Sequence, residues 1–115
     1  MPTMIYLLRI DDFAAAHGAD PELAFAGASP EALVAALTDA LRTPALFERW
    51  RGKQDEPDQV PAALGATDAT ASVHAAQHDL HVELEVRTRL PHALLKQRLD
   101  WLIGPHWTLR DVRAG

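Results

Sequence analysis

The chain has 115 residues, a formal net charge of −5, no cysteine and an apolar fraction of 48%. Its length indicates one domain. The lack of cysteine excludes disulfides, a thiol nucleophile and thiolate metal sites, and the acidic total argues against general nucleic-acid binding. The N-terminus does not resemble a signal peptide, and no apolar run approaches the roughly 20 residues that span a bilayer. We therefore expect a soluble, cytoplasmic protein that does not bind membranes.

Charge is unevenly distributed along the chain. Residues 1–86 hold five basic residues against fourteen acidic ones, whereas residues 87–115 hold six against two. Such asymmetry can mark a surface for an anion or a partner. The basic third can equally face the acidic part of its own chain, and both interpretations stay open. Nucleic-acid binding by the basic third ranks last because the total charge is negative.

The first predicted strand spans Met4 to Ile10, which is β-prone and almost entirely apolar. A run that is apolar on both faces is typical of a central strand. Asp11 and Asp12 follow it, and paired carboxylates can bind a metal or exchange protons. We interpret them instead as the N-cap of a short helix that ends at Gly18.

A longer helix is predicted from Ser29-Pro30-Glu31, because a serine cap with proline at the first helical position marks a helix start. Pro44 should end this helix near Arg42. A second short helix then runs to Gly52. Residues 53–68 form a polar, proline-containing connector that is long for a compact domain, so we expect it to be mobile or functional.

The segment 70–88 predicts a β-hairpin. Its second half places four apolar side chains on one face in strict alternation: Leu80, Val82, Leu84 and Val86. Folding the two halves about His78-Asp79 puts Ala75 opposite Val82. A slip of one residue would set apolar rows against polar ones, so the pattern specifies the register.

A last helix is predicted to begin at Leu90-Pro91 and to end at Gly104-Pro105. Residues 106–113 follow as an edge strand, with Leu109 on one face and Val112 on the other. The resulting order is βαββαβ, that of the ferredoxin-like fold. It predicts an α+β sandwich with a four-stranded antiparallel sheet, helices on one face, and the first and third strands in the centre. This resemblance concerns the fold alone and indicates no function.

The hairpin also suggests a metal site. The predicted register sets His74 opposite Glu83, on the same sheet face as His81. Neighbours on one face lie roughly 5 to 8 Å apart. Two imidazoles and a carboxylate at such spacing can bind zinc or another divalent metal, and His78 and Asp79 at the turn can add to this set. The alternative is that this face is solvated or forms an interface, with no cofactor.

A second candidate surface combines Trp101 with Arg98 and Arg110, since a partly exposed tryptophan beside arginines can anchor an interface. Core packing is the alternative for the tryptophan. The chain contains no nucleophile elbow, P-loop or dinucleotide fingerprint. We therefore expect a non-enzymatic domain that acts by protein–protein contact, as a homodimer through the open sheet face or an edge strand. The rival hypothesis is a domain that binds a metal or a small ligand, as an enzyme or as a binding module, through the hairpin face.

Overall fold

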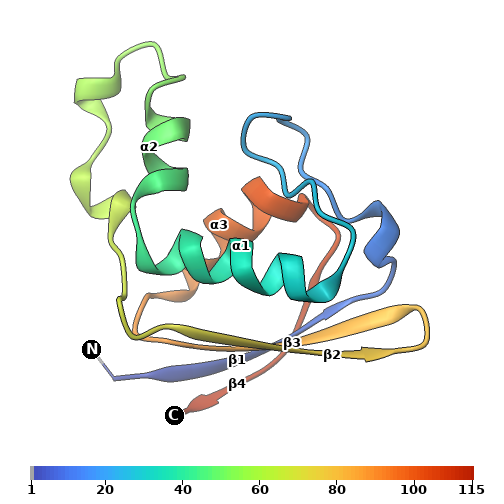
Figure 1. Ribbon diagram of the computed structural model, residues 1–115. Coiled ribbons are helices and arrows are strands. Elements are labelled where there is room, and N and C mark those ends of the chain that lie inside the picture. The colour runs from blue at the N-terminus through green and yellow to red at the C-terminus, as the bar shows by residue number, and fades with distance from the viewer. Residues whose placement is uncertain (1) are drawn as a thin grey trace.

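The computed structural model describes residues 2–115 and shows an α+β fold (Figure 1). The strands are Met4–Ile10 (β1), Ser72–His78 (β2), His81–Thr88 (β3) and Thr108–Ala114 (β4). The helices are Pro30–Arg42 (α1), Ala45–Arg51 (α2) and His92–Ile103 (α3). Short 3-10 turns occur at Phe13–Ala15, Pro57–Gln59 and Ala62–Gly65.

The four strands form one sheet in the order β2-β3-β1-β4, and every neighbouring pair is antiparallel. Both α1 and α3 lie on one side of this sheet, and the opposite side is bare (Figure 1). The predicted α+β class, the antiparallel sheet and the central position of β1 and β3 are therefore confirmed.

The core fills the space between the sheet and the helices. Alternate residues of β1 and β3 point toward the helices, as the period of two requires. The buried side chains of these two strands are Tyr6, Leu8, Ile10, Val82, Leu84 and Val86. The buried apolar stripe of α1 consists of Leu33, Leu37, Ala40 and Leu41, and that of α3 of Leu95, Leu99, Leu102 and Ile103.

Capping residues in the local sequence set the start of α1 and the end of α3. Ala32 N–H donates a 3.1 Å hydrogen bond to the Ser29 hydroxyl, so the predicted cap of α1 is confirmed. Gly104 ends α3 with a φ of 65°, a left-handed conformation that favours glycine. The cap expected at Asp12 is wrong, because its side chain makes no capping hydrogen bond to the 3-10 turn that follows. Asp11 instead pairs with Arg9 Nε at 2.5 Å.

The predicted hairpin register is wrong by two residues. Ala75 pairs with Leu84 rather than Val82, and the turn consists of Asp79 and Leu80. Asp79 adopts a φ of 56°, a left-handed conformation that aspartate tolerates and that a two-residue turn needs. Because the shift is even, each side chain keeps its predicted face. Leu80 is the exception: it lies in the turn and is 85% exposed.

The predicted faces of the last strand also need correction. The pairing of β4 with β1 shifts between Leu7 and Leu8, which marks a β-bulge. Val112 pairs with Tyr6 and Leu109 pairs with Leu8. The extra residue therefore brings Leu109 and Val112 to the same, helix-facing side, not to opposite sides. As predicted, β4 is an edge strand.

Candidate functional site

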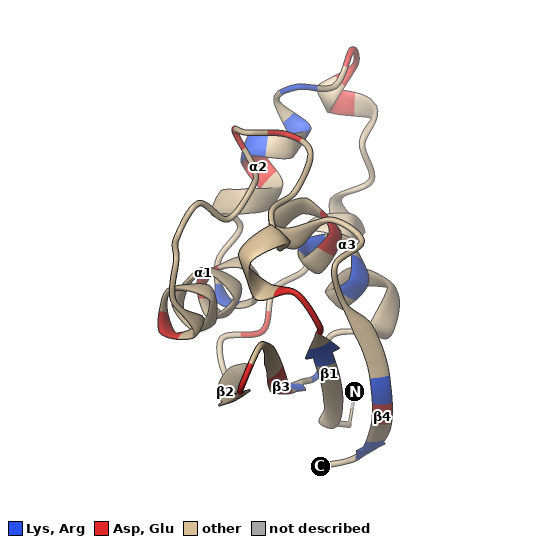
Figure 2. Cartoon of the chain, turned by 90° about the vertical axis from the view of Figure 1, so that its right-hand side faces the viewer, with Lys and Arg blue, Asp and Glu red and all other residues tan. Residues whose placement is uncertain are grey.

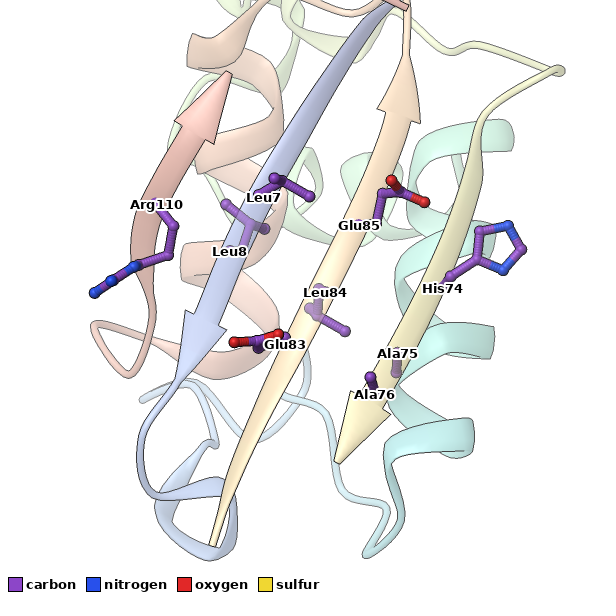
Figure 3. Close-up of a pocket in the computed structure, with 9 residues that line it drawn as sticks. All are labelled: Leu7, Leu8, His74, Ala75, Ala76, Glu83, Leu84, Glu85 and Arg110. Atoms are coloured by element: carbon purple, nitrogen blue, oxygen red, sulfur yellow. The ribbon is translucent and has the colours of Figure 1, made fainter. Parts of the chain in front are cut away.

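The bare side of the sheet, here called the open face, carries a shallow groove of about 340 Å³ (Figure 3). All four strands contribute to it. The groove is lined by Leu7, Leu8, His74, Ala75, Ala76, Glu83, Leu84, Glu85 and Arg110. The small side chains of β2 leave the two glutamates of β3 accessible, so the groove combines apolar walls with carboxylates.

Charges on the open face are separated across the sheet. On β3, Glu83 and Glu85 face the same side as the histidines of β2. On the other edge, β4 carries Arg110 and Arg113 with Asp111 between them, seen as alternating bands in Figure 2. The half of the face near β2 therefore carries Glu83, Glu85 and the histidines, with Arg87 further along β3, and the half near β4 is mainly basic.

Three side chains gather at the turn end of the hairpin. The rings of His78 and His81 stack with centroids 5.3 Å apart. Glu83 reaches both: its Oε2 lies 3.5 Å from His78 Nε2 and its Oε1 lies 3.7 Å from His81 Nε2. All three are solvent-accessible, so their attraction is screened by water.

The observed register changes which histidine joins this cluster. His74 lies opposite Glu85, not Glu83, and Figure 3 shows its ring directed past the outer edge of β2. His81 and Glu83 of the predicted set are thus brought together, and His78 takes the place assigned to His74. A hairpin turn centred on Asp79-Leu80 would have revealed this from the sequence.

Metal binding at the predicted set His74, His81 and Glu83 stays a prediction. Within residues 2–115, no three side chains of the histidine, aspartate and glutamate kinds are arranged as ligands for one metal ion.

The predicted interface residues do not form one surface patch. Trp101 stacks on Trp50 with centroids 5.1 Å apart and is half-buried. Arg98 is fully buried, with its guanidinium carbon 5.9 Å from the centre of the Trp101 ring. Arg110 lies on β4 and lines the groove on the opposite side of the sheet from α3. Arg98 therefore cannot contact a partner, and Trp101 and Arg110 serve different surfaces.

Arg98 instead anchors the connector to α3. Its Nη2 donates a 2.8 Å hydrogen bond to the carbonyl of Ala66, and its Nη1 donates to Gln97 Oε1 at 3.1 Å and to the Leu94 carbonyl at 3.3 Å. Among residues 2–115, its Nε has no hydrogen-bond partner. Burial lowers the pKa of Arg98. The sequence carries no signal for this, since an arginine beside a helix stripe is normally exposed.

Asp68 forms the second buried polar group that sequence analysis missed. Its carboxylate, 2% exposed, accepts hydrogen bonds from Arg89 N–H at 2.8 Å, the Thr70 hydroxyl at 2.7 Å and the Thr88 hydroxyl at 3.0 Å. Burial alone raises the pKa of Asp68, but these donors outweigh it and hold the pKa well below its usual range. The carboxylate of Asp68 therefore fixes the end of the connector to the end of β3.

No family model, curated protein or solved structure matches this chain. Within residues 2–115, no helix combines the length and apolar character that crossing a membrane requires.

Proposed function

We propose that this chain is a non-enzymatic domain that acts by protein–protein contact, with a second copy of itself as the partner. The observation that carries the proposal is the open face: a four-stranded sheet that the helices cover on one side only. An uncovered sheet with an accessible groove offers a preformed area for another molecule.

Charge separation supports a second copy as the occupant. In this dimer the open faces of two copies meet. The twofold axis runs parallel to the strands in the plane between the two sheets, over the boundary between β1 and β3. It therefore sets the half near β2 of one copy against the half near β4 of the other. Glu85 of each copy then faces the side that carries Arg110 of the other. Such an isologous contact uses each complementary pair twice.

Sedimentation velocity at tens of micromolar tests the proposal, with dimer expected at low salt and weaker dimer at high salt. Charge reversal by Glu85→Arg or by Arg110→Glu should each dissociate the dimer, and the double variant should restore it. Lys96→Glu, on the helix side, is the matched control. A wild-type monomer at all concentrations contradicts the proposal.

We also infer the ferredoxin-like arrangement. Its support is the βαββαβ order of the long elements together with the sheet order β2-β3-β1-β4, in which β1 and β2 are both antiparallel to β3. The extra helix α2 and the connector are then insertions in the first crossover. An experimental structure tests this through the hand of that crossover, which should be right-handed.

Divalent-metal binding at the hairpin is the second candidate function, favoured by the close approach of His78 and His81 to the two oxygens of Glu83. A metal would have to draw the three side chains together. Zinc titration by calorimetry tests it. Loss of binding in His78→Ala and His81→Ala, but not in His74→Ala, supports this set. Loss in His74→Ala supports the set predicted from sequence, and no binding by the wild type removes the candidate.

A further inference from the structure

The two outer strands of the sheet differ in how they are protected against pairing with another chain. Natural edge strands carry charges, prolines or bulges that discourage added strands. The β4 edge has a bulge and the charged residues Arg110, Asp111 and Arg113. The β2 edge, Ser72–His78, has none of these: its sequence SVHAAQH contains no permanently charged residue and no proline.

The backbone N–H and C=O groups on the outer side of β2 are also not bonded to another segment of residues 2–115. Residues 74–78 are all exposed. Within residues 2–115, the only backbone hydrogen bonds of Ser72–His78 are those to β3. An edge strand of this kind presents unpaired N–H and C=O groups in alternation, ready to bond to another extended chain.

Helix α1 shapes the space beside this edge. It packs above β2 and reaches past its outer side (Figures 2 and 3). Ala75 points to the helix layer, opposite the buried Leu84, yet it is exposed. Its methyl group is therefore accessible to solvent on the side of the sheet that carries α1. A second copy of the chain that paired through this edge would bring its own α1 up against the overhanging helix, whereas a bare extended segment would not.

We propose that the β2 edge binds an extended segment of a partner protein, which adds to the sheet as a fifth strand beneath α1. Strand addition of this kind draws affinity from the backbone and specificity from alternate side chains. On the helix side, the exposed methyl group of Ala75 offers an apolar contact to a side chain of the added strand. On the open-face side, Ala76 of β2 lies between the added strand and Glu83 of β3, and its side chain is only a methyl group.

The chemistry of the open-face side selects a basic residue in the partner segment. An added strand lies two strand spacings, about 10 Å, from β3. A lysine or arginine opposite Ala76 can extend over that methyl group toward Glu83, and Glu85 lies next along the same strand face. The expected segment therefore alternates apolar residues with basic or small polar ones.

A synthetic peptide with alternating valine and lysine or threonine tests the proposal, followed by amide chemical shifts in NMR titration. The largest shifts should map to residues 72–78. A peptide with the same side chains, but N-methylated at every second amide, should bind at least about tenfold more weakly because it cannot form the ladder. Replacing its lysines by glutamates should weaken binding severalfold.

Three results would overturn the inference: no binding at millimolar peptide, equal binding of the N-methylated peptide, or shifts centred on β4. Cross-linking separates this surface from self-association, because the chain has no cysteine of its own. On non-reducing electrophoresis, an oxidised Ala75→Cys variant should form no more disulfide-linked dimer than Val112→Cys, which carries its cysteine on the other edge. A covalent dimer specific to Ala75→Cys would identify a second copy as the occupant and refute a partner segment.

Discussion

The hydroxyl of Thr88 donates a 3.0 Å hydrogen bond to Oδ2 of Asp68, and both residues are buried. Thr88 ends β3 and Asp68 ends the connector, so the bond ties together segments twenty residues apart. Asp68 N–H in turn donates to the carbonyl of Leu41 in α1 at 2.8 Å. This small polar network sets where the chain enters the hairpin.

Replacing Asp68 by alanine should destabilise the protein by about 3 kcal/mol, because several buried donors lose a charged acceptor at once. Urea unfolding measures this change in free energy. Asp58→Ala, at an exposed position in the connector, is the matched control and should stay within about 0.5 kcal/mol of the wild type. An equal effect of the two substitutions would contradict the structural role of Asp68.

Stability should also fall with acid through Asp68. Since its pKa is lower in the folded than in the unfolded chain, its contribution is complete above the unfolded pKa of about 3.9 and is lost as the pH falls toward the folded value. Between about pH 5 and pH 3, the wild type should lose about 1 kcal/mol more than Asp68→Asn. Parallel urea titrations of the two proteins measure the difference. Identical acid profiles would show that Asp68 is not the group responsible.

Arg98→Ala should loosen the connector before it unfolds the protein. The substitution removes the 2.8 Å hydrogen bond to the Ala66 carbonyl, which joins the connector to α3. Amide hydrogen exchange at Asp68, whose N–H bonds to α1, should accelerate more than exchange in β1. Arg42→Ala is the matched control, since its Nε donates to the nearby carbonyl of Ala71 instead. Uniform acceleration across the chain would indicate only global destabilisation.

Two glycines should respond to alanine in opposite ways. A Cβ at Gly18 would lie 2.2 Å from the carbonyl oxygen of Trp101, a backbone atom that cannot move aside cheaply. In the described part of the chain, the nearest atom to a Cβ at Gly52 would be the carbonyl oxygen of Glu48 at 3.5 Å, and the φ of −63° at Gly52 is helical. Gly18→Ala should therefore cost about 3 kcal/mol, whereas Gly52→Ala should be neutral or stabilise by up to about 1 kcal/mol. Thermal unfolding of both variants checks the order.

Local patterns in the sequence were sufficient for most of the secondary structure. The apolar run at Met4–Ile10 predicted a central strand, and the Ser29-Pro30 cap predicted the start of α1 at its observed residue. The hairpin turn was harder because moving the turn by one residue shifts the strand pairing by two residues and keeps the same side chains inside. Choosing between them required the left-handed Asp79 in a two-residue turn.

The candidate site depended on this choice. The faces of His74, His81 and Glu83 follow from the period of two, which any even register preserves. Which histidine lies next to Glu83 depends on the register itself, and so it changed from His74 to His78. The predicted interface residues Trp101, Arg98 and Arg110 do not form one patch for a different reason. The burial of Arg98 depends on the connector, and the connector sequence carries no periodic pattern.

The sequence by itself determined the strands, the helices and the inward face of the hairpin, because these depend on neighbours within a few residues. Only the tertiary structure decided the register, the bulge that turns Val112 toward the helices, the burial of Asp68 and Arg98, and the unequal protection of the two sheet edges. These features arise where segments distant in sequence meet. There the free energy of burying a polar group depends on donors and acceptors that the local sequence does not contain.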